Sequence, residues 1–213
     1  MPKQSSVLAE IAERRAADLT AELGQRTVRE VVREAGPGPA SRDVTGRFAR
    51  AGLHLIAEIK RSSPSAGSMV DGELDVAQRA RAYQAGGASM ISVLVEPHWF
   101  GGSLQDLQAA RAATSLPVLA KEFVVDERQL PLLRAAGADA VLLLATLHPA
   151  KRLARFVRTA IDVGLEPLVE AHSARELEAA LATDAHLIGI NNRNLKTLAV
   201  DTSMCERLRA HAV

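Results

Sequence analysis

The sequence predicts an α/β fold in which parallel strands alternate with helices and curl into a barrel. The 213-residue chain contains six apolar runs typical of strands, and each is followed by a stretch of helical character. The runs are continuous rather than alternating, which indicates strands that are buried on both faces. Repeated strand–helix units imply parallel strands joined by right-handed crossovers.

The expected strands and helices follow each other at similar spacing. We expect strands at residues 54–60, 89–95, 117–123, 139–145, 165–170 and 186–191. We expect helices at residues 73–85, 103–113, 127–136, 149–163, 173–183 and 201–211. Glycines stand where several of these helices should end, as C-caps do, namely Gly86, Gly87, Gly137 and Gly164.

A helical region precedes the first expected strand. Apolar residues recur at helical spacing between charges over residues 5–35. Gly24 should interrupt this run, and a second, short helix should start at Thr27. The Gly-Pro-Gly-Pro stretch at residues 36–39 predicts a loop between these helices and the alternating units.

The composition limits the kinds of function. The net charge of +1 favours neither nucleic acid nor an anionic membrane as a partner, although a small anionic substrate needs only local charge. The single cysteine, Cys205, excludes an internal disulfide and a cysteine-based zinc cluster, and we expect it in the core. There is no signal-peptide pattern and no run near the roughly 18 apolar residues of a membrane helix. We expect a cytoplasmic protein.

Four expected strands end in a charged or amide residue where a buried strand should be apolar. These residues are Lys60, Lys121, Glu170 and Asn191. Burying an unpaired charge is costly, so a repeated charge at strand ends needs a reason. A structural ion pair could explain one position. In a parallel sheet, however, ligands bind at the carboxyl ends of the strands, so four such positions favour a site.

Two architectures fit these units, a barrel and an open doubly wound sheet. An open sheet concentrates its site at one switch point, usually beside a glycine-rich first loop. The loop at residues 61–67, Arg-Ser-Ser-Pro-Ser-Ala-Gly, is neither a dinucleotide fingerprint nor a P-loop. Because several strand ends carry polar groups, we favour the barrel, in which these strands share one site on the axis.

The strand-end residues suggest acid–base chemistry. The strand period of two puts Glu58 and Lys60 on one face. Lys121 and Glu170, facing each other across a poorly hydrated mouth, could act as general acid and general base. Burial should lower the pKa of the lysine and raise the pKa of the glutamate, which would bring both towards neutrality.

The remaining polar residues are less informative. Asn191 and Arg193 offer hydrogen-bond donors, and an arginine fork suits a carboxylate or a phosphate. Asn192 and Asn194 are typical of a turn. The histidines show no metal-binding spacing, and we expect loop or rim positions for all six: His54, His98, His148, His172, His186 and His211.

Five motifs resemble one enzyme family. Residues 57–67, Ala-Glu-Ile-Lys-Arg-Ser-Ser-Pro-Ser-Ala-Gly, resemble the signature of indole-3-glycerol phosphate synthases, the ring-closing lyases of tryptophan biosynthesis. The other motifs follow in the order of that family, at residues 91–103, 119–123, 168–172 and 188–195. The resemblance covers essentially the whole chain. It implies a TIM (β/α)8-type barrel that uses neither a metal nor an organic cofactor.

The resemblance also implies a substrate and residue roles. The family converts 1-(2-carboxyphenylamino)-1-deoxyribulose 5-phosphate into indole-3-glycerol phosphate, carbon dioxide and water. Lys121 would protonate the substrate carbonyl as the ring closes, and Glu170 would be the base of the later dehydration. Lys60 would bind anionic groups, and Glu58 would stabilise positive charge and orient the lysines. The implied substrate-binding residues are Ser63, Pro64, Phe100, Phe123, Leu142, Asn191 and Arg193.

The sequence departs from the family in two places. Glu122 stands where an aspartate is commoner, and a barrel of this kind typically needs about 250 residues. We therefore expect one barrel domain over residues 1–213, with a helical extension at 1–50 and only βα units one to six at 51–213. Units seven and eight, which usually supply the phosphate site, would be absent. We expect a complete barrel to be a monomer, whereas self-association stays open for this chain.

Two other functions stay open. The chain could be a non-catalytic, truncated remnant of this barrel. It could also be another phosphate-binding barrel enzyme, such as a phosphoribosyl isomerase. Such an isomerase would use an aspartate or cysteine acid–base pair at its strand ends, where this chain has lysine and glutamate.

Overall fold

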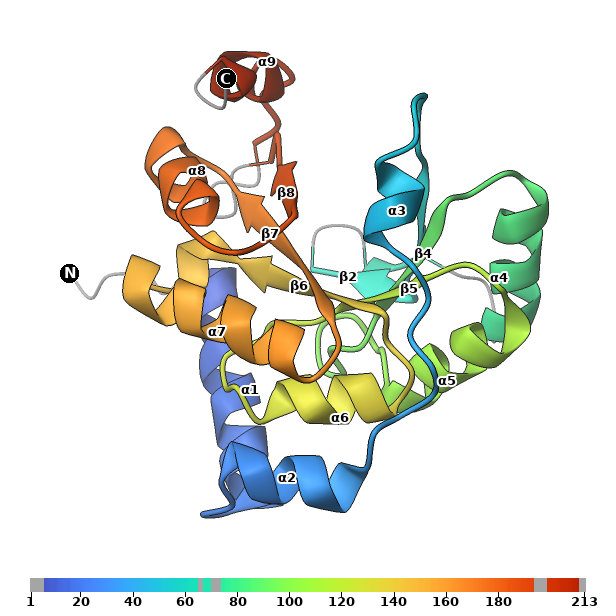
Figure 1. Cartoon of the computed structure of the whole chain (residues 1–213), viewed down its shortest axis with the longest axis vertical. Coiled ribbons are helices and arrows are strands. Elements are labelled where there is room, and N and C mark those ends of the chain that lie inside the picture. Colours follow the sequence, from blue (N-terminus) through green and yellow to red (C-terminus); the bar gives the residue numbers. More distant parts are fainter. Residues whose placement is uncertain (1–5, 65–66, 70–73, 194–198, 211–213) are drawn as a thin grey trace.

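The computed structural model describes residues 6–64, 67–69, 74–193 and 199–210. Its centre is a parallel sheet of six strands that curls as a barrel does, with helices on its outer face (Figure 1). The strands are β1 (Ile56–Ile59), β4 (Met90–Leu94), β5 (Val118–Lys121), β6 (Ala140–Leu144), β7 (Glu166–Ala171) and β8 (Leu187–Ile190). They lie side by side in chain order. A doubly wound sheet reverses its order at a switch point, so the barrel-type prediction is confirmed.

The helices connect successive strands, as the sequence predicts. After β1 they are α4 (Val76–Ala85), α5 (Leu104–Ala113), α6 (Gln129–Ala135), α7 (Ala150–Asp162), α8 (Ala174–Leu181) and α9 (Met204–Arg209), with a 3₁₀ turn, η1 (Ala145–Leu147). Among the described residues, no helix is both long enough and apolar enough to span a membrane. Two expected helix limits, residues 73 and 211, lie outside the described residues.

Three helices precede the first strand. They are α1 (Val7–Leu23), α2 (Val28–Ala35) and α3 (Thr45–Phe48). Helix α1 ends at Gly24, whose φ of 54° is a conformation that glycine adopts without strain. Helix α2 starts with a capping box, in which Thr27 and Glu30 each accept from the other's backbone N–H. The predicted break and restart are therefore present, whereas the short helix α3 was not predicted.

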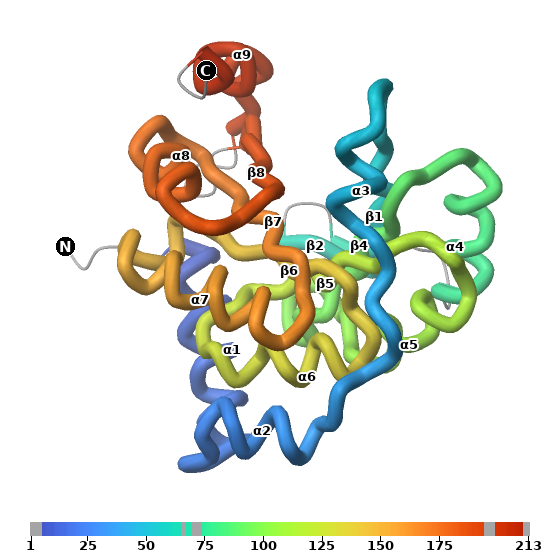
Figure 2. Tube along the Cα trace, viewed as in Figure 1, coloured from blue at the N-terminus to red at the C-terminus, as the bar shows by residue number. Residues whose placement is uncertain are grey.

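Two of the four hydrophobic core clusters among the described residues lie on opposite faces of the sheet. The larger one lies between the outer face and the helices, with Ile91 and Val141 of the strands packed in one cluster with Phe156 of α7. The smaller one lies on the inner face, where Val44 joins Met90 and Leu119. Each face of the sheet packs against apolar residues, which explains why the strands are apolar at successive positions. Figure 2 shows the chain between α2 and α3 running along the sheet.

Cys205 does not belong to this core. Cys205 is exposed on α9, so the prediction that it is a small core residue is wrong. The helix contacts the rest of the protein through Leu208, which is buried in a cluster with Ala171 and Leu177.

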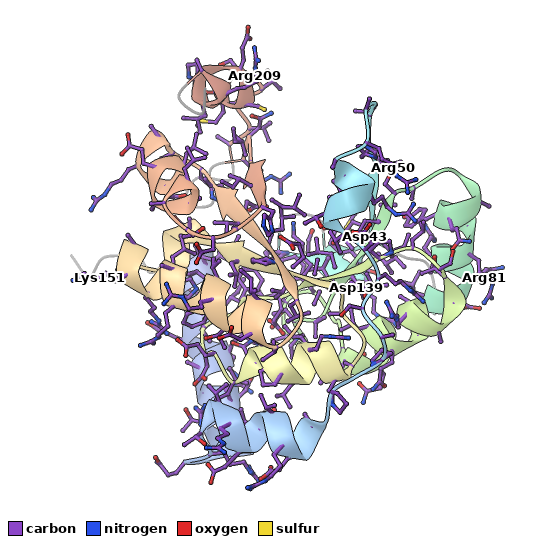
Figure 3. All side chains as sticks on the ribbon, in the orientation of Figure 1. Asp43, Arg50, Arg81, Asp139, Lys151 and Arg209 are labelled. Atoms are coloured by element: carbon purple, nitrogen blue, oxygen red, sulfur yellow. The ribbon has the colours of Figure 1, made fainter. Side chains whose placement is uncertain are left out.

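A buried carboxylate joins the N-terminal region to the sheet. Asp139, whose side chain is fully buried, accepts hydrogen bonds from the backbone N–H groups of Arg42 at 2.8 Å and Val118 at 2.9 Å. The guanidinium of Arg111, on α5, also donates to it. Figure 3 places Asp139 beside the segment that carries Asp43. One side chain therefore links the pre-barrel segment, helix α5 and strand β5.

We predict that Asp139→Ala lowers the free energy of unfolding by about 3 kcal/mol or more, because the sheltered guanidinium of Arg111 loses its carboxylate partner and two backbone N–H groups lose their acceptor. Urea denaturation followed by circular dichroism measures this change. Asp184→Ala, at an exposed position, is the matched control and should alter stability little. Equal midpoints for the two variants would contradict the assigned role of Asp139.

Candidate active site

The register of the parallel strands places the charged strand ends along one edge of the sheet. Glu58 of β1 pairs with Ser92 of β4, and Leu94 of β4 pairs with Lys121 of β5. Further along, Glu170 of β7 pairs with Gly189 of β8. Because parallel strands run in the same direction, their carboxyl ends meet on one side of the molecule. The candidate site is built on these ends.

Lys121 lies between two carboxylates. Its Nζ atom is 3.6 Å from Glu58 Oε2 and 3.8 Å from Glu170 Oε2. A second lysine, Lys60, donates to the other oxygen of Glu58 at 3.0 Å. The side chain of Lys121 is 31% exposed and that of Glu170 is 14% exposed, so the group is sheltered but open to a small molecule. A proton donor and a proton acceptor thus share one site.

Glu170 is bound on its other side as well. Its Oε1 atom accepts from Asn191 Nδ2 at 3.0 Å and lies 3.2 Å from His172 Nε2. Burial alone would raise the pKa of Glu170, but His172, Lys121 and Asn191 together outweigh burial and hold this pKa below its usual value. The expected rise is therefore wrong. The sequence pattern predicts the burial of Glu170 and the nearby Lys121, but not the contact with His172.

The predicted substrate-binding residues near β1 lie in and beside a small hairpin. Strands β2 (Ser62–Ser63) and β3 (Gly67–Ser68) pair in antiparallel fashion, with Ser63 buried and Pro64 exposed. The hydroxyl of Ser62 donates to the carbonyl of Trp99 at 3.0 Å, and this bond fastens the hairpin to the loop after β4. Residues 65–66 of the signature motif lie outside the described residues.

Other predicted residues give the site an apolar side. The rings of Phe100 and Phe123 are in contact, with centroids 5.8 Å apart. Leu142 is buried in β6, next to Leu168 in the register. Arg193 is exposed, and its backbone N–H donates to Asn191 Oδ1 at 2.9 Å. Within the described residues, its guanidinium forms no ion pair with the carboxylates of the site. Asn194 lies outside the described residues.

Glu96 is a residue that sequence analysis missed. It is fully buried, and its carboxylate accepts from the backbone N–H groups of His98 at 2.8 Å, Trp99 at 2.7 Å and Phe100 at 3.0 Å. It therefore sets the path of the loop that carries Phe100. A signal was available, because Glu96 is a charged residue that directly follows an apolar strand run.

A second missed carboxylate ties helix α1 to the catalytic side. The guanidinium of Arg15 binds both oxygens of the buried Glu122, at 3.2 and 3.1 Å. Burial raises the pKa of Glu122, although Arg15 opposes the rise. Glu122 directly follows Lys121, so this pair holds α1 against the end of β5. Nothing local in residues 7–23 indicates which arginine would do so.

The five described histidines lie in loops, as expected, but two of them have sheltered side chains, and His211 lies outside the described residues. His148 is buried, stacks on Phe156 with ring centroids 4.5 Å apart, and binds the carbonyl of Val124 at 2.9 Å. Burial and the nearby Arg152 lower its pKa to about 4, so it is neutral at physiological pH. His172 is sheltered behind Glu170, with its side chain 8% exposed. Their loop positions are as expected, whereas the burial of the two rings was not predicted.

Parallel strands in sequential order, with paired lysine and glutamate side chains at their carboxyl ends, are the arrangement of an α/β barrel enzyme. The model of the family described as indole-3-glycerol phosphate synthase matches residues 8–213. The chain belongs to the indole-3-glycerol phosphate synthase family. Members of this family are carboxy-lyases of tryptophan biosynthesis.

Individual relatives agree with the family match. The indole-3-glycerol phosphate synthase of Streptomyces griseus subsp. griseus is 43% identical over 203 residues, which cover 95% of this chain and 75% of that protein. The indole-3-glycerol phosphate synthase of Micrococcus luteus is 48% identical over 168 residues, which cover 76% of this chain and 62% of that protein. Among solved structures, a mandelate oxidase matches with a TM-score of 0.45 and 19% identity, over 53% of this chain and 44% of that one, which is too weak to support an inference.

We predict that Glu96→Ala loosens the loop around Trp99, the only tryptophan, because three sheltered N–H groups lose their acceptor at a cost of about 3 kcal/mol or more. Quenching of tryptophan fluorescence by acrylamide should increase at denaturant concentrations where circular dichroism is still that of the folded protein. Glu178→Ala, an exposed helix position, is the control. Unchanged quenching in Glu96→Ala would contradict the assignment.

Proposed function

We propose that this chain catalyses the reaction of its family, the conversion of 1-(2-carboxyphenylamino)-1-deoxyribulose 5-phosphate into indole-3-glycerol phosphate, carbon dioxide and water. The observation that carries this proposal is the position of Lys121 between the carboxylates of Glu58 and Glu170. The reaction needs one group that gives a proton and one that takes a proton at nearly the same place, and this cluster supplies both.

Lys121 is the proposed general acid of ring closure. It protonates the substrate carbonyl oxygen while the ring carbon that bears the carboxylate attacks the carbonyl carbon. Loss of carbon dioxide then restores the aromatic ring. The distances of 3.6 and 3.8 Å from its Nζ atom to the two carboxylates exceed those of a hydrogen bond, so the ammonium group can turn to the substrate.

Glu170 is the proposed general base of the dehydration that follows. It removes a proton from the ring-closed intermediate as the hydroxyl group leaves with a proton to form water. Its lowered pKa supports this role, since the carboxylate is ionised and ready to accept. Glu58 stabilises positive charge and holds both lysines, which lie 3.0 and 3.6 Å from its two oxygens.

The substrate would lie across the strand ends. We assign the aromatic ring to the apolar side formed by Phe100, Phe123 and Leu142, where aromatic contacts add to apolar burial. Lys60, Ser63 and Arg193 are assigned to the anionic groups of the substrate. Pro64 lines the same loop, and Asn191 positions Glu170. Holding the ring and the carbonyl together in such a slot accounts for part of the rate enhancement.

We further propose one domain over residues 1–213, in which a helical extension at 1–50 precedes βα units one to six at 51–213. The partner is a small anionic substrate rather than nucleic acid or a membrane. We propose that the protein acts in the cytoplasm, as a biosynthetic enzyme would. We also propose that the complete barrel is a monomer.

We predict that the purified chain forms indole-3-glycerol phosphate and that Lys121→Ala lowers the rate by about 100-fold or more with little loss of stability, because it removes the general acid. The measurement is product formation followed by chromatography. The matched control is Lys151→Ala in α7, an exposed residue that Figure 3 shows at the outer edge of the molecule.

Two outcomes would contradict the proposal. Equal rates for Lys121→Ala and Lys151→Ala would remove Lys121 from the mechanism. A folded chain with no turnover would favour the alternative of a non-catalytic barrel. If Lys121→Ala has the same denaturation midpoint as the original chain, a loss of activity reflects the missing amine rather than unfolding.

A further inference from the structure

A histidine lies directly behind the proposed base, between two carboxylates. His172 Nε2 is 3.2 Å from Glu170 Oε1, and His172 Nδ1 is 3.4 Å from Glu176 Oε2. The ring nitrogens are fully enclosed and not aligned for hydrogen bonds, so these contacts are ion pairs. The two nitrogens of one ring thus face two different carboxylates.

The second carboxylate is held firmly at the start of helix α8. Glu176 lies in the first turn, which is capped by the hydroxyl of Ser173. Glu176 Oε2 accepts from the backbone N–H of His172 at 2.8 Å, and its Oε1 accepts from the hydroxyl of Thr146 at 2.9 Å. A helix N-terminus also stabilises negative charge. Glu176 is therefore a fixed anion behind the imidazole ring.

The two oxygens of Glu170 have different partners. Asn191 and His172 both contact Oε1, whereas Lys121 lies on the side of Oε2. With Oε1 engaged from two directions, Oε2 is the oxygen directed at Lys121 and is left for proton transfer. Holding Oε1 away from Lys121 in this way calls for a positive charge or a hydrogen-bond donor next to Oε1. His172 is placed to provide the positive charge.

We propose that His172 is a positioning residue for this reaction: its imidazolium, fixed by Glu176, keeps Glu170 ionised with Oε2 directed at Lys121. The proposal rests on the proposed function, in which Glu170 is the base. His172 touches neither the lysine nor the expected substrate position, so it acts through Glu170. No assignment from the sequence or the family resemblance gives His172 a role.

The electrostatic balance agrees with this geometry. Burial would lower the pKa of His172, but Glu170 and Glu176 outweigh burial and raise it to about 9. Within the described part of the chain, these two are the charged groups that face the ring, and Lys121 of β5 lies beyond Glu170. Burial would raise the pKa of Glu176, yet its partners lower it to about 2. All three groups are therefore charged at neutral pH.

The sign of the resulting pH dependence follows from the raised pKa. The pKa of His172 rises from 6.5 to about 9 on folding, so its contribution to stability is complete below pH 6.5 and is lost as the pH rises through about 9. The proton that makes His172 an imidazolium also helps to keep Glu170 ionised. Removing the imidazole would leave two carboxylates facing each other, and such repulsion raises a carboxylate pKa.

The test compares His172→Asn and His172→Gln with His186→Asn. His186 also pairs with a strand carboxylate, Glu166, at 3.2 Å, but its side chain is 68% exposed, and the pair lies at the amino ends of β8 and β7. In both His172 variants we expect the acidic limb of the kcat profile to move up by about one pH unit or more. The limb should not move in His186→Asn.

A second measurement needs no turnover. Carbon-13 NMR of labelled glutamate side chains follows the titration of Glu170, which should shift upward by the same amount in His172→Asn. In the unsubstituted chain, the imidazole of His172 should titrate near pH 9, and Glu176→Gln should lower that value. If the histidine variants fail to fold, these two chains still decide the question.

The outcomes separate this inference from the proposed function. An imidazole that titrates at or below pH 6.5 overturns the inference, as does an active His172→Asn variant whose acidic limb is unchanged. Absent turnover in the unsubstituted chain contradicts the proposed function alone, because the NMR titrations still show whether His172 holds Glu170 ionised. Equal shifts in the asparagine and glutamine variants support the charge of His172, rather than a hydrogen bond, as the cause.

Discussion

The in-register pairing of parallel strands is the constraint on which the rest of the structure depends. Each βα unit repeats the same direction, so whatever residue ends a strand is carried to the same edge as its neighbours. Glu58, Lys121 and Glu170 are separated by 63 and 49 residues in sequence, from 58 to 121 and from 121 to 170, yet they meet within ion-pair distance. No loop needs a special conformation to assemble them.

Alternation of charge makes this crowded edge stable. The ionised groups follow one another as Lys60, Glu58, Lys121, Glu170, His172 and Glu176. Each inner member has opposite charge on both sides, which offsets the desolvation that half-buried charges incur. The series ends at a helix N-terminus, where backbone groups and Thr146 complete it. Deleting a member therefore affects its neighbours as well as its own contacts, and single substitutions should not be additive along the series.

Much of this could be predicted from the sequence, because the relevant signals are local. Apolar runs, glycine C-caps and the break at Gly24 are properties of neighbouring residues, and the strand-end positions follow from them. The contacts of Arg15 with Glu122 and of His172 with Glu176 depend on how helices α1 and α8 lie against the sheet. No pattern in a single sequence predicts how these helices lie against the sheet. The lowered pKa of Glu170 escaped prediction because it depends on how the side chain of His172 is oriented, which the sequence does not state.

The anchor at Asp139 has a consequence for how the family can vary. Two of its three donors are main-chain N–H groups, those of Arg42 and Val118, and every residue type except proline supplies such a donor. At this carboxylate, the joint between the pre-barrel segment and the sheet is thus encoded by the path of the backbone and by one acceptor. These two hydrogen bonds do not depend on which side chain stands at position 42 or 118, so they can persist where those residues differ, provided that neither is proline.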